Sequence, residues 1–203
     1  MIDFHTAPTP NGRKVSILLE ELALPYQVHT VNLSKGEQKA PGFLALNANG
    51  KIPVIVDSEG PVVLAESGAI LIYLAEKTGS ALLPATGAAR AQVFQWLMFQ
   101  ISGLGATFGR VFYFRSRLPE PQPVGLAHFE TEAQRLLDVM ETQLAAHPWL
   151  GGDTYSIADI ATYPWMAPHE KLGIPLGERP AVRRWMDTMA QRPAVIAGMA
   201  VPG

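Results

Sequence analysis

The stretch Asn49-Gly50-Lys51-Ile52-Pro53-Val54-Ile55-Val56 decides the fold of this chain. Asn-Gly is typical of a turn, and the β-branched run that follows predicts a strand. Pro53 stands at the strand entrance, where a missing N–H is tolerated and where a cis peptide bond would turn the chain sharply. Such a turn would leave the backbone N–H and C=O of Ile52 free to pair with a peptide laid alongside.

A helix start follows at Glu66-Ser67-Gly68-Ala69-Ile70. A helix N-terminus offers free N–H donors and the positive end of a dipole, which suits a carboxylate. Taken alone, the segment from Asn49 to Val56 is explained as well by an ordinary hairpin, and the segment from Glu66 to Ile70 by an ordinary helix cap. The pair at this spacing predicts a seat for a small peptide, with its backbone on Ile52 and its terminal carboxylate on Ser67.

Composition limits the function. The 203 residues are 48% hydrophobic and 17% charged, which is typical of a globular protein of one or two domains. A net charge of −2 without a basic run argues against a nucleic-acid partner. No stretch is long enough to span a bilayer and no signal peptide is evident, so we expect a cytoplasmic protein without a membrane partner. The chain has no cysteine, and its histidines lack metal-ligand spacing. We therefore expect no metal, and any sulfur chemistry must use a thiol of the substrate.

The first part of the chain predicts the order β-α-β-α-β-β-α. The expected strands are 1–4, 26–31, 54–56 and 62–64, and the expected helices are 11–22 with Asn11 as N-cap, 41–46 and 67–77. The first two strands should run parallel, and the last two should form a hairpin. This is the thioredoxin-like arrangement, which we assign to residues 1–79.

Beyond a linker at residues 80–86 the sequence shows no strand pattern. We expect an all-helical domain over residues 87–203, so the fold class is α/β followed by all-α. The expected helices are 88–114, 126–146, one opened by the capping box Ser156-Ile157-Ala158-Asp159, and 180–192, which Pro193 should end.

Thr9-Pro10-Asn11-Gly12 lies in the predicted loop after the first strand, where ligands of α/β units usually bind. The hydroxyl of Thr9 and the amide of Asn11 can both donate hydrogen bonds. Taken alone, the loop is explained equally by a turn and a helix cap. Joined to the groove at Ile52 and the seat at Ser67, it predicts a small peptide that carries its own thiol, and glutathione is the obvious one.

With these motifs the chain resembles the cytosolic glutathione transferases over nearly its whole length. The resemblance is carried by Lys51-Ile52-Pro53, Glu66-Ser67-Gly68-Ala69-Ile70 with Tyr73-Leu74, and Ser156-Ile157-Ala158-Asp159. Thr9-Pro10-Asn11-Gly12 further resembles the bacterial Nu class, whose members have glutathione-dependent disulfide reductase activity.

The resemblance implies glutathione as co-substrate, a homodimer and a role for each matching residue. Ile52 would pair with the cysteinyl part of glutathione after a cis Pro53, and Glu66 and Ser67 would bind the γ-glutamyl end. The remaining implied contacts are Gln38 and Lys51 at the flank, and Thr9 and Asn11 at the sulfur.

Thiolate stabilisation needs no general base here. A thiol has a pKa near 8.5, and lowering it by about two units takes about 2.7 kcal/mol. One hydrogen bond to a charged group contributes roughly 1.5–3 kcal/mol, and a helix terminus roughly 0.3–1 kcal/mol. Either Thr9 or Asn11 can be that donor.

The chain departs from the Nu-class pattern in its first long helix. Arg110-Val111-Phe112-Tyr113-Phe114 stands where Nu-class members carry a Gln-x-His-His-Phe-type stretch, and His128 stands where they carry an arginine. Phe108, Phe112 and Tyr113 are therefore candidates for a pocket that accepts an electrophilic, aromatic co-substrate. They serve equally well as core or dimer packing.

The sequence thus predicts a glutathione transferase that directs the thiolate at an electrophile, a hydroperoxide or a disulfide. The alternative is a non-catalytic protein-interaction module, because fold does not fix function.

Overall fold

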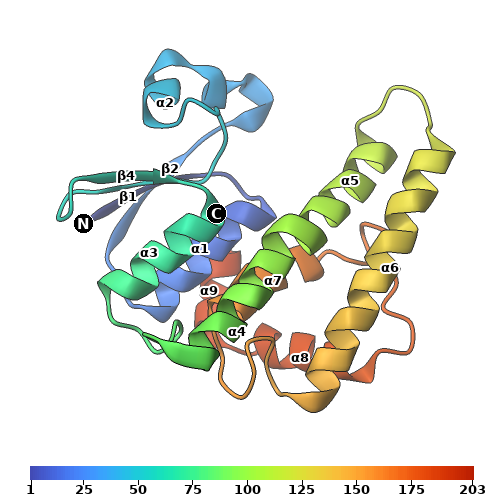
Figure 1. Cartoon of the computed structure of the whole chain (residues 1–203). Coiled ribbons are helices and arrows are strands. Elements are labelled where there is room, and N and C mark those ends of the chain that lie inside the picture. The colour runs from blue at the N-terminus through green and yellow to red at the C-terminus, as the bar shows by residue number, and fades with distance from the viewer. The chain divides into compact units, whose positions relative to one another are not determined.

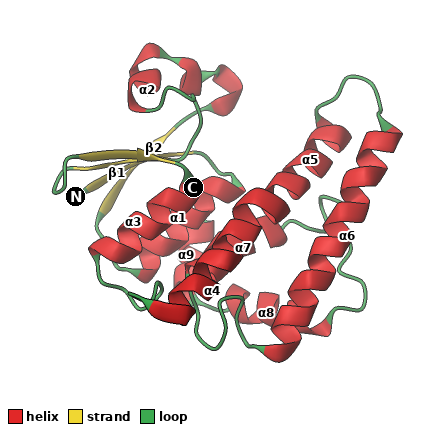
Figure 2. Cartoon of the chain, viewed as in Figure 1, coloured by secondary structure: helices red, strands yellow, loops and turns green.

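A computed structural model describes residues 1–203, which form two compact units (Figure 1). The first unit combines Met1–Leu83 with Gln191–Gly203, and the second is Pro84–Ala190. Strands occur in the first unit, whereas the second is built of helices (Figure 2). The α/β plus all-α prediction is confirmed.

The first unit carries a four-stranded sheet of order β2-β1-β3-β4. Its elements are β1 (Ile2–Thr6), α1 (Pro10–Glu21), β2 (Tyr26–Thr30), two short 3-10 turns at Leu33–Lys35 and Glu37–Lys39, α2 (Pro41–Leu46), β3 (Val54–Asp57), β4 (Val62–Ala65) and α3 (Ser67–Lys77). As predicted, β1 and β2 run parallel, and β3 and β4 form an antiparallel hairpin. This is the thioredoxin-like arrangement.

The core of this unit lies between the sheet and the helices α1 and α3, which cover one face of it (Figure 1). Phe4 and Ile55 point from the strands, and Leu18 and Leu71 point from the helices; all four are fully buried. A smaller cluster of Val31, Phe43 and Val54 lies elsewhere in the unit, and α2 contributes to it. Burial of these side chains fixes the register of β3.

The C-terminal helix α9 (Pro193–Met199) packs against α1. Ser16 Oγ donates a 2.7 Å hydrogen bond to the Gly198 carbonyl, and Arg192 pairs with Glu21. A Cβ at Gly198 would lie 2.5 Å from Ile17 Cα, so glycine permits this close approach. The predicted domain range 87–203 stays a prediction, but residues 191–203 lie with the first unit, and Pro193 begins a helix that the sequence did not predict.

The helices of the second unit are α4 (Gly87–Met98), a π-helical segment (Phe99–Leu104), α5 (Gly105–Ser116), α6 (Pro123–Ala146), α7 (Ile157–Met166) and α8 (Pro180–Ala190). The helix expected over 88–114 is thus interrupted by the π-helical segment. The capping box is confirmed: Asp159 accepts hydrogen bonds from the Ser156 and Leu150 N–H groups and from Trp185 Nε1.

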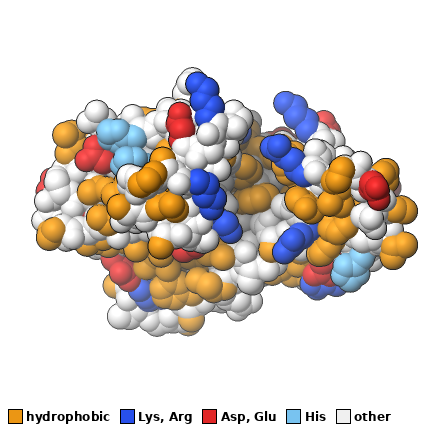
Figure 3. Space-filling view, turned by 90° about the horizontal axis from the view of Figure 1, so that it is seen from above, with side chains coloured by type: hydrophobic (Ala, Val, Ile, Leu, Met, Phe, Trp, Pro, Cys, Tyr) orange, Lys and Arg blue, Asp and Glu red, His pale blue; other side chains and the backbone are white.

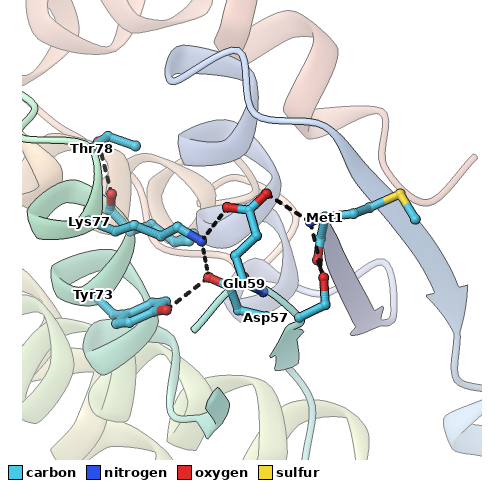
Figure 4. A network of polar contacts seen from close by, with 8 residues as sticks. Met1, Asp57, Glu59, Tyr73, Lys77 and Thr78 are labelled. Carbon is cyan, nitrogen blue, oxygen red and sulfur yellow. Dashed lines mark hydrogen bonds and ion pairs between the residues drawn. The ribbon is translucent and has the colours of Figure 1, made fainter. Parts of the chain in front are cut away.

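A polar network ties the hairpin of the first unit to α3 and to the N-terminus (Figure 4). The buried Asp57 accepts hydrogen bonds from Lys77 and from Tyr73 Oη, the latter at 2.8 Å. Glu59 bridges Lys77 and the amino group of Met1. Burial alone would raise the pKa of Asp57, but the bonds from Lys77 and Tyr73 hold it below its usual value.

None of the helices is long and apolar enough to cross a membrane. The face drawn in Figure 3 carries Lys and Arg side chains together with acidic, hydrophobic and uncharged ones.

Candidate functional site

Strand register brings three predicted segments to one edge of the sheet. His5 in β1 lies opposite Val54 in β3, and Val54 lies opposite Ala65 in β4. The loop after β1, the turn before β3 and the start of α3 after β4 therefore open at the same edge. The structure thus brings together the segments that carry the predicted donors, the predicted peptide groove and the predicted carboxylate seat.

The groove residue Ile52 precedes a cis peptide bond to Pro53, as expected from the sequence. Its side chain packs against the cluster of Val31, Phe43 and Val54, and Pro53 is buried. The strand pairing of β3 begins only at Val54, so the Ile52 backbone lies outside the sheet. The Ile52 backbone is therefore not used in the ladder of the sheet, which is compatible with the predicted pairing with an extended peptide.

The predicted carboxylate seat consists of Glu66 and Ser67. Ser67 is the first residue of α3 and is buried. Glu66 is the N-cap residue and has φ +68°, a left-handed conformation that is uncommon for residues other than glycine. Strain of this kind concentrates at ligand sites.

Lys14 contacts the predicted site, although the sequence did not single it out. It lies in α1, is buried, and places Nζ 3.4 Å from Ser67 Oγ. A signal was present, because Lys14 precedes the buried Ile17 and Leu18 by three and four residues and so lies on the apolar stripe of α1.

Thr9 is the N-cap residue of α1, and the expectation that Asn11 caps this helix is wrong. Thr9 Oγ1 accepts a 3.3 Å hydrogen bond from the Gly12 N–H, and Pro10 is the first helical residue. Since its oxygen is held by Gly12, the Thr9 hydroxyl can donate its hydrogen elsewhere. Asn11 lies in the first turn of α1, one position further on.

The flanking residues Gln38 and Lys51 lie near the turn before β3. Gln38 Oε1 is buried without a hydrogen-bond partner, whereas its Nε2 donates weakly to the Leu33 carbonyl. A Cβ on Gly50 would lie 3.0 Å from the Gln38 carbonyl oxygen, so the backbone at Gly50 is in close contact with the backbone at Gln38. The exposed Lys51 is held through its carbonyl, which accepts a 2.8 Å hydrogen bond from Asn47 Nδ2.

The three aromatic candidates belong to α5 in the helical unit. Phe108 is fully buried in the core of that unit, while Phe112 is 40% exposed and Tyr113 is 46% exposed. Arg117 lies over the Phe112 ring at 5.5 Å from its centroid. The assignment of these residues to a co-substrate pocket stays a prediction.

A thioredoxin-like unit with a cis-proline before β3, followed by an all-helical unit, is the architecture expected of a glutathione transferase. The profiles described as "Glutathione S-transferase, N-terminal domain" and "Glutathione S-transferase, C-terminal domain" match residues 9–77 and 107–193. The chain belongs to the glutathione S-transferase family, as its sequence motifs predicted.

Relatives at high identity agree with this membership. The chain is 45% identical to the disulfide-bond oxidoreductase YfcG of Escherichia coli K12 over 199 residues, which cover 96% of this chain and 92% of that protein. A Pseudomonas fluorescens Pf-5 glutathione transferase family member, solved with two glutathione bound, is 43% identical with a TM-score of 0.92, covering 99% of this chain and 93% of the other. A Pseudomonas putida glutathione transferase, solved with one glutathione disulfide per subunit, is 40% identical with a TM-score of 0.94, covering 100% and 92%.

Proposed function

We propose that this protein binds glutathione at the sheet edge of its first unit and presents the thiolate to an electrophile, a hydroperoxide or a disulfide. The observation that carries the proposal is the convergence of Ile52, Ser67 and Thr9 at that edge. In this arrangement the Ile52 backbone pairs with the cysteinyl residue, and Ser67 with Glu66 binds the γ-glutamyl end. Gln38 and Lys51 contact glutathione from the flank.

Thr9 and Asn11 then stabilise the thiolate. Both stand at the N-terminus of α1, where the helix dipole favours a negative charge. Because Gly12 holds the Thr9 oxygen, the Thr9 hydroxyl hydrogen is available to the sulfur. Asn11 supplies a second donor and also contacts the glutathione. The protein's contribution is to position the thiolate and stabilise its charge.

Disulfides are the co-substrate class to test first. A relative 45% identical to this chain is named a disulfide-bond oxidoreductase, and another was solved with glutathione disulfide. In such a reaction the thiolate attacks one sulfur of the disulfide, forms a mixed disulfide and releases the other sulfur as a thiolate. The exposed Phe112 and Tyr113 favour an aromatic electrophile as a second class.

We also propose that the chain forms a homodimer and acts in the cytoplasm. Met98 and Ile101, on α4 and the π-helical segment, are 47% and 36% exposed and could bury apolar surface against a second copy. A reducing compartment keeps glutathione as the thiol. A single monomeric species in sedimentation velocity would contradict the dimer.

Calorimetric titration of glutathione into wild type and Ser67→Ala tests the proposed site. We expect wild type to bind and Ser67→Ala to bind at least about tenfold more weakly, because a hydrogen bond to a charged group is lost. Ser116→Ala, which removes an exposed hydroxyl in the helical unit, is the matched control and should bind as wild type does. Absence of binding by wild type would refute the proposal and favour a protein-interaction module.

A further inference from the structure

Lys14 is a lysine buried in the interior of the first unit. Its side chain is 2% exposed, although lysine is almost never fully buried unless it is paired. The long aliphatic side chain of lysine usually allows the ammonium group to remain in water. Here Nζ instead donates to Ser67 Oγ at the start of α3. The charge of Lys14 is therefore directed at the predicted carboxylate seat.

The contact between Lys14 and Ser67 controls where the serine hydroxyl points. A protonated lysine has three donors and no acceptor, so Ser67 Oγ can only accept from it. The hydroxyl hydrogen of Ser67 is then left for another acceptor. A neutral amine has a lone pair that could take this hydrogen and turn the hydroxyl inward.

We propose that Lys14 is a positioning residue for the γ-glutamyl carboxylate of glutathione, acting by keeping the Ser67 hydroxyl as a donor and by taking up a proton when that carboxylate binds. The inference rests on the proposed function, because it requires a carboxylate at Ser67.

The electrostatics around Lys14 allow this proton uptake. Burial lowers the pKa of Lys14 to about 7, although the carboxylate of Glu66 acts in the opposite direction. The neighbouring helix α9, Pro193–Met199, contains no ionisable side chain. In α3 the ionisable side chains Tyr73, Glu76 and Lys77 lie toward the opposite end from Ser67. Glu66, the N-cap residue of α3, is thus the charged residue of this segment that acts on Lys14, and a bound carboxylate would add a second negative charge.

The size of the uptake follows from the pKa. Near neutral pH about half of the Lys14 side chains carry the charge in the unliganded protein. A nearby opposite charge raises the pKa of an amine, so the bound state should be fully protonated. We expect uptake of about half a proton per ligand at about pH 7.

Calorimetry with S-methylglutathione measures the uptake without interference from the ligand thiol, which this compound lacks. Titrations at about pH 7 in two buffers that differ in ionisation enthalpy give the number of protons taken up per ligand bound. The test compares wild type with Lys14→Met, whose unbranched apolar side chain fills similar space without a charge. Lys171→Met removes an exposed lysine of the helical unit and serves as the matched control.

We expect wild type and Lys171→Met to take up about half a proton and Lys14→Met to take up none. At about pH 6, where Lys14 is charged, Lys14→Met should bind S-methylglutathione roughly tenfold more weakly than wild type does. A tenfold change corresponds to a rise of about one unit in the pKa of Lys14 when the ligand binds. A lysine that only filled space would leave the proton count unchanged when replaced.

Two results would overturn the inference while the proposed function stands: wild type that binds without proton uptake, or Lys14→Met that takes up the same number of protons. Absence of wild-type binding would overturn both. If circular dichroism shows that Lys14→Met does not fold, the affinity of wild type for S-methylglutathione between about pH 6 and 8 tests the inference instead. A decline with rising pH supports the inference, and a constant affinity overturns it.

Discussion

Replacing Gly12 with alanine is expected to disturb the proposed thiolate-binding end of the site more than the proposed peptide seat. A Cβ on Gly12 would lie 2.3 Å from Thr6 Oγ1 and 2.5 Å from the Ala7 carbonyl oxygen. The second of these atoms is backbone, so relief requires the loop before α1 or the first turn of α1 to move. Real Cβ atoms essentially never lie closer than 3.0 Å to such a neighbour, which implies a shift of at least about 0.5 Å.

The change in the free energy of unfolding of Gly12→Ala is the sum of two opposing effects. Overpacking costs about 1–3 kcal/mol, and alanine in place of glycine in a helix returns up to about 1 kcal/mol. We expect a net loss of about 1–2 kcal/mol in the free energy of unfolding. The shift also moves the Thr9 hydroxyl, which Gly12 holds. Since misplacement by about 1 Å can cost about 100-fold, kcat/KM with glutathione should fall roughly 10- to 100-fold.

Urea unfolding, glutathione calorimetry and turnover of a disulfide together check this prediction. The glutathione Kd should change less than kcat/KM, because Ile52 and Ser67 lie on other segments, whereas Thr9 and Asn11 lie on the segment that moves. Gly42→Ala in α2 is the matched control, since nothing lies within 4 Å of its Cβ. It should be neutral or stabilising by up to about 1 kcal/mol. Wild-type stability and turnover in Gly12→Ala would refute the steric reasoning.

Three further changes test the framework that holds the site. Asp57→Asn should lower the free energy of unfolding by about 2 kcal/mol in urea at neutral pH, because the charge-assisted bond from Lys77 is lost. The pKa of Asp57 is lower in the folded protein than in the unfolded one. Its contribution to the free energy of unfolding is therefore present above the unfolded pKa and is lost as the pH falls through the folded pKa. The free energies of unfolding of wild type and Asp57→Asn should thus converge in acid. Gly198→Ala should loosen the packing of α9 against Ile17 and lower the free energy of unfolding by about 1–3 kcal/mol. A rate of proteolysis of the C-terminal segment equal to that of wild type would contradict this. Asp159→Ala leaves buried N–H donors unpaired and should cost about 3–5 kcal/mol in thermal or urea unfolding; a cost below about 1 kcal/mol would be inconsistent with the hydrogen bonds described.

Local patterns were sufficient to predict most of the sheet unit. The β-branched run at Val54, the hairpin and the helix at Ser67 all follow from short-range periodicity and turn residues, and the structure has them in place. The cap of α1 was assigned to the wrong residue, although Pro10 gave the signal: proline is favoured at the first helical position, which makes Thr9 the N-cap.

Features that depend on distant contacts were not predictable from local patterns. The π-helical segment at Phe99 differs from an α-helix by a single shift of hydrogen-bond partners, which side-chain periodicity over six residues does not resolve. The docking of α9 depends on Gly198 meeting Ile17 across most of the chain. The contact between Lys14 and Ser67 depends on the packing of α1 against α3, since the two residues are 53 positions apart in sequence.

The return of the C-terminal segment to the first unit also has a consequence for biosynthesis. The sheet and α1 emerge from the ribosome first, but α9 follows only after the whole helical unit has been translated. At about 5–20 residues per second, the apolar surface of α1 that α9 covers would wait roughly 9–34 s for its partner, since about 170 residues separate the end of α1 from the start of α9. During that interval the nascent chain carries an exposed hydrophobic strip, which is a surface that chaperones recognise. A C-terminal deletion that removes α9 would leave this strip uncovered for the lifetime of the protein.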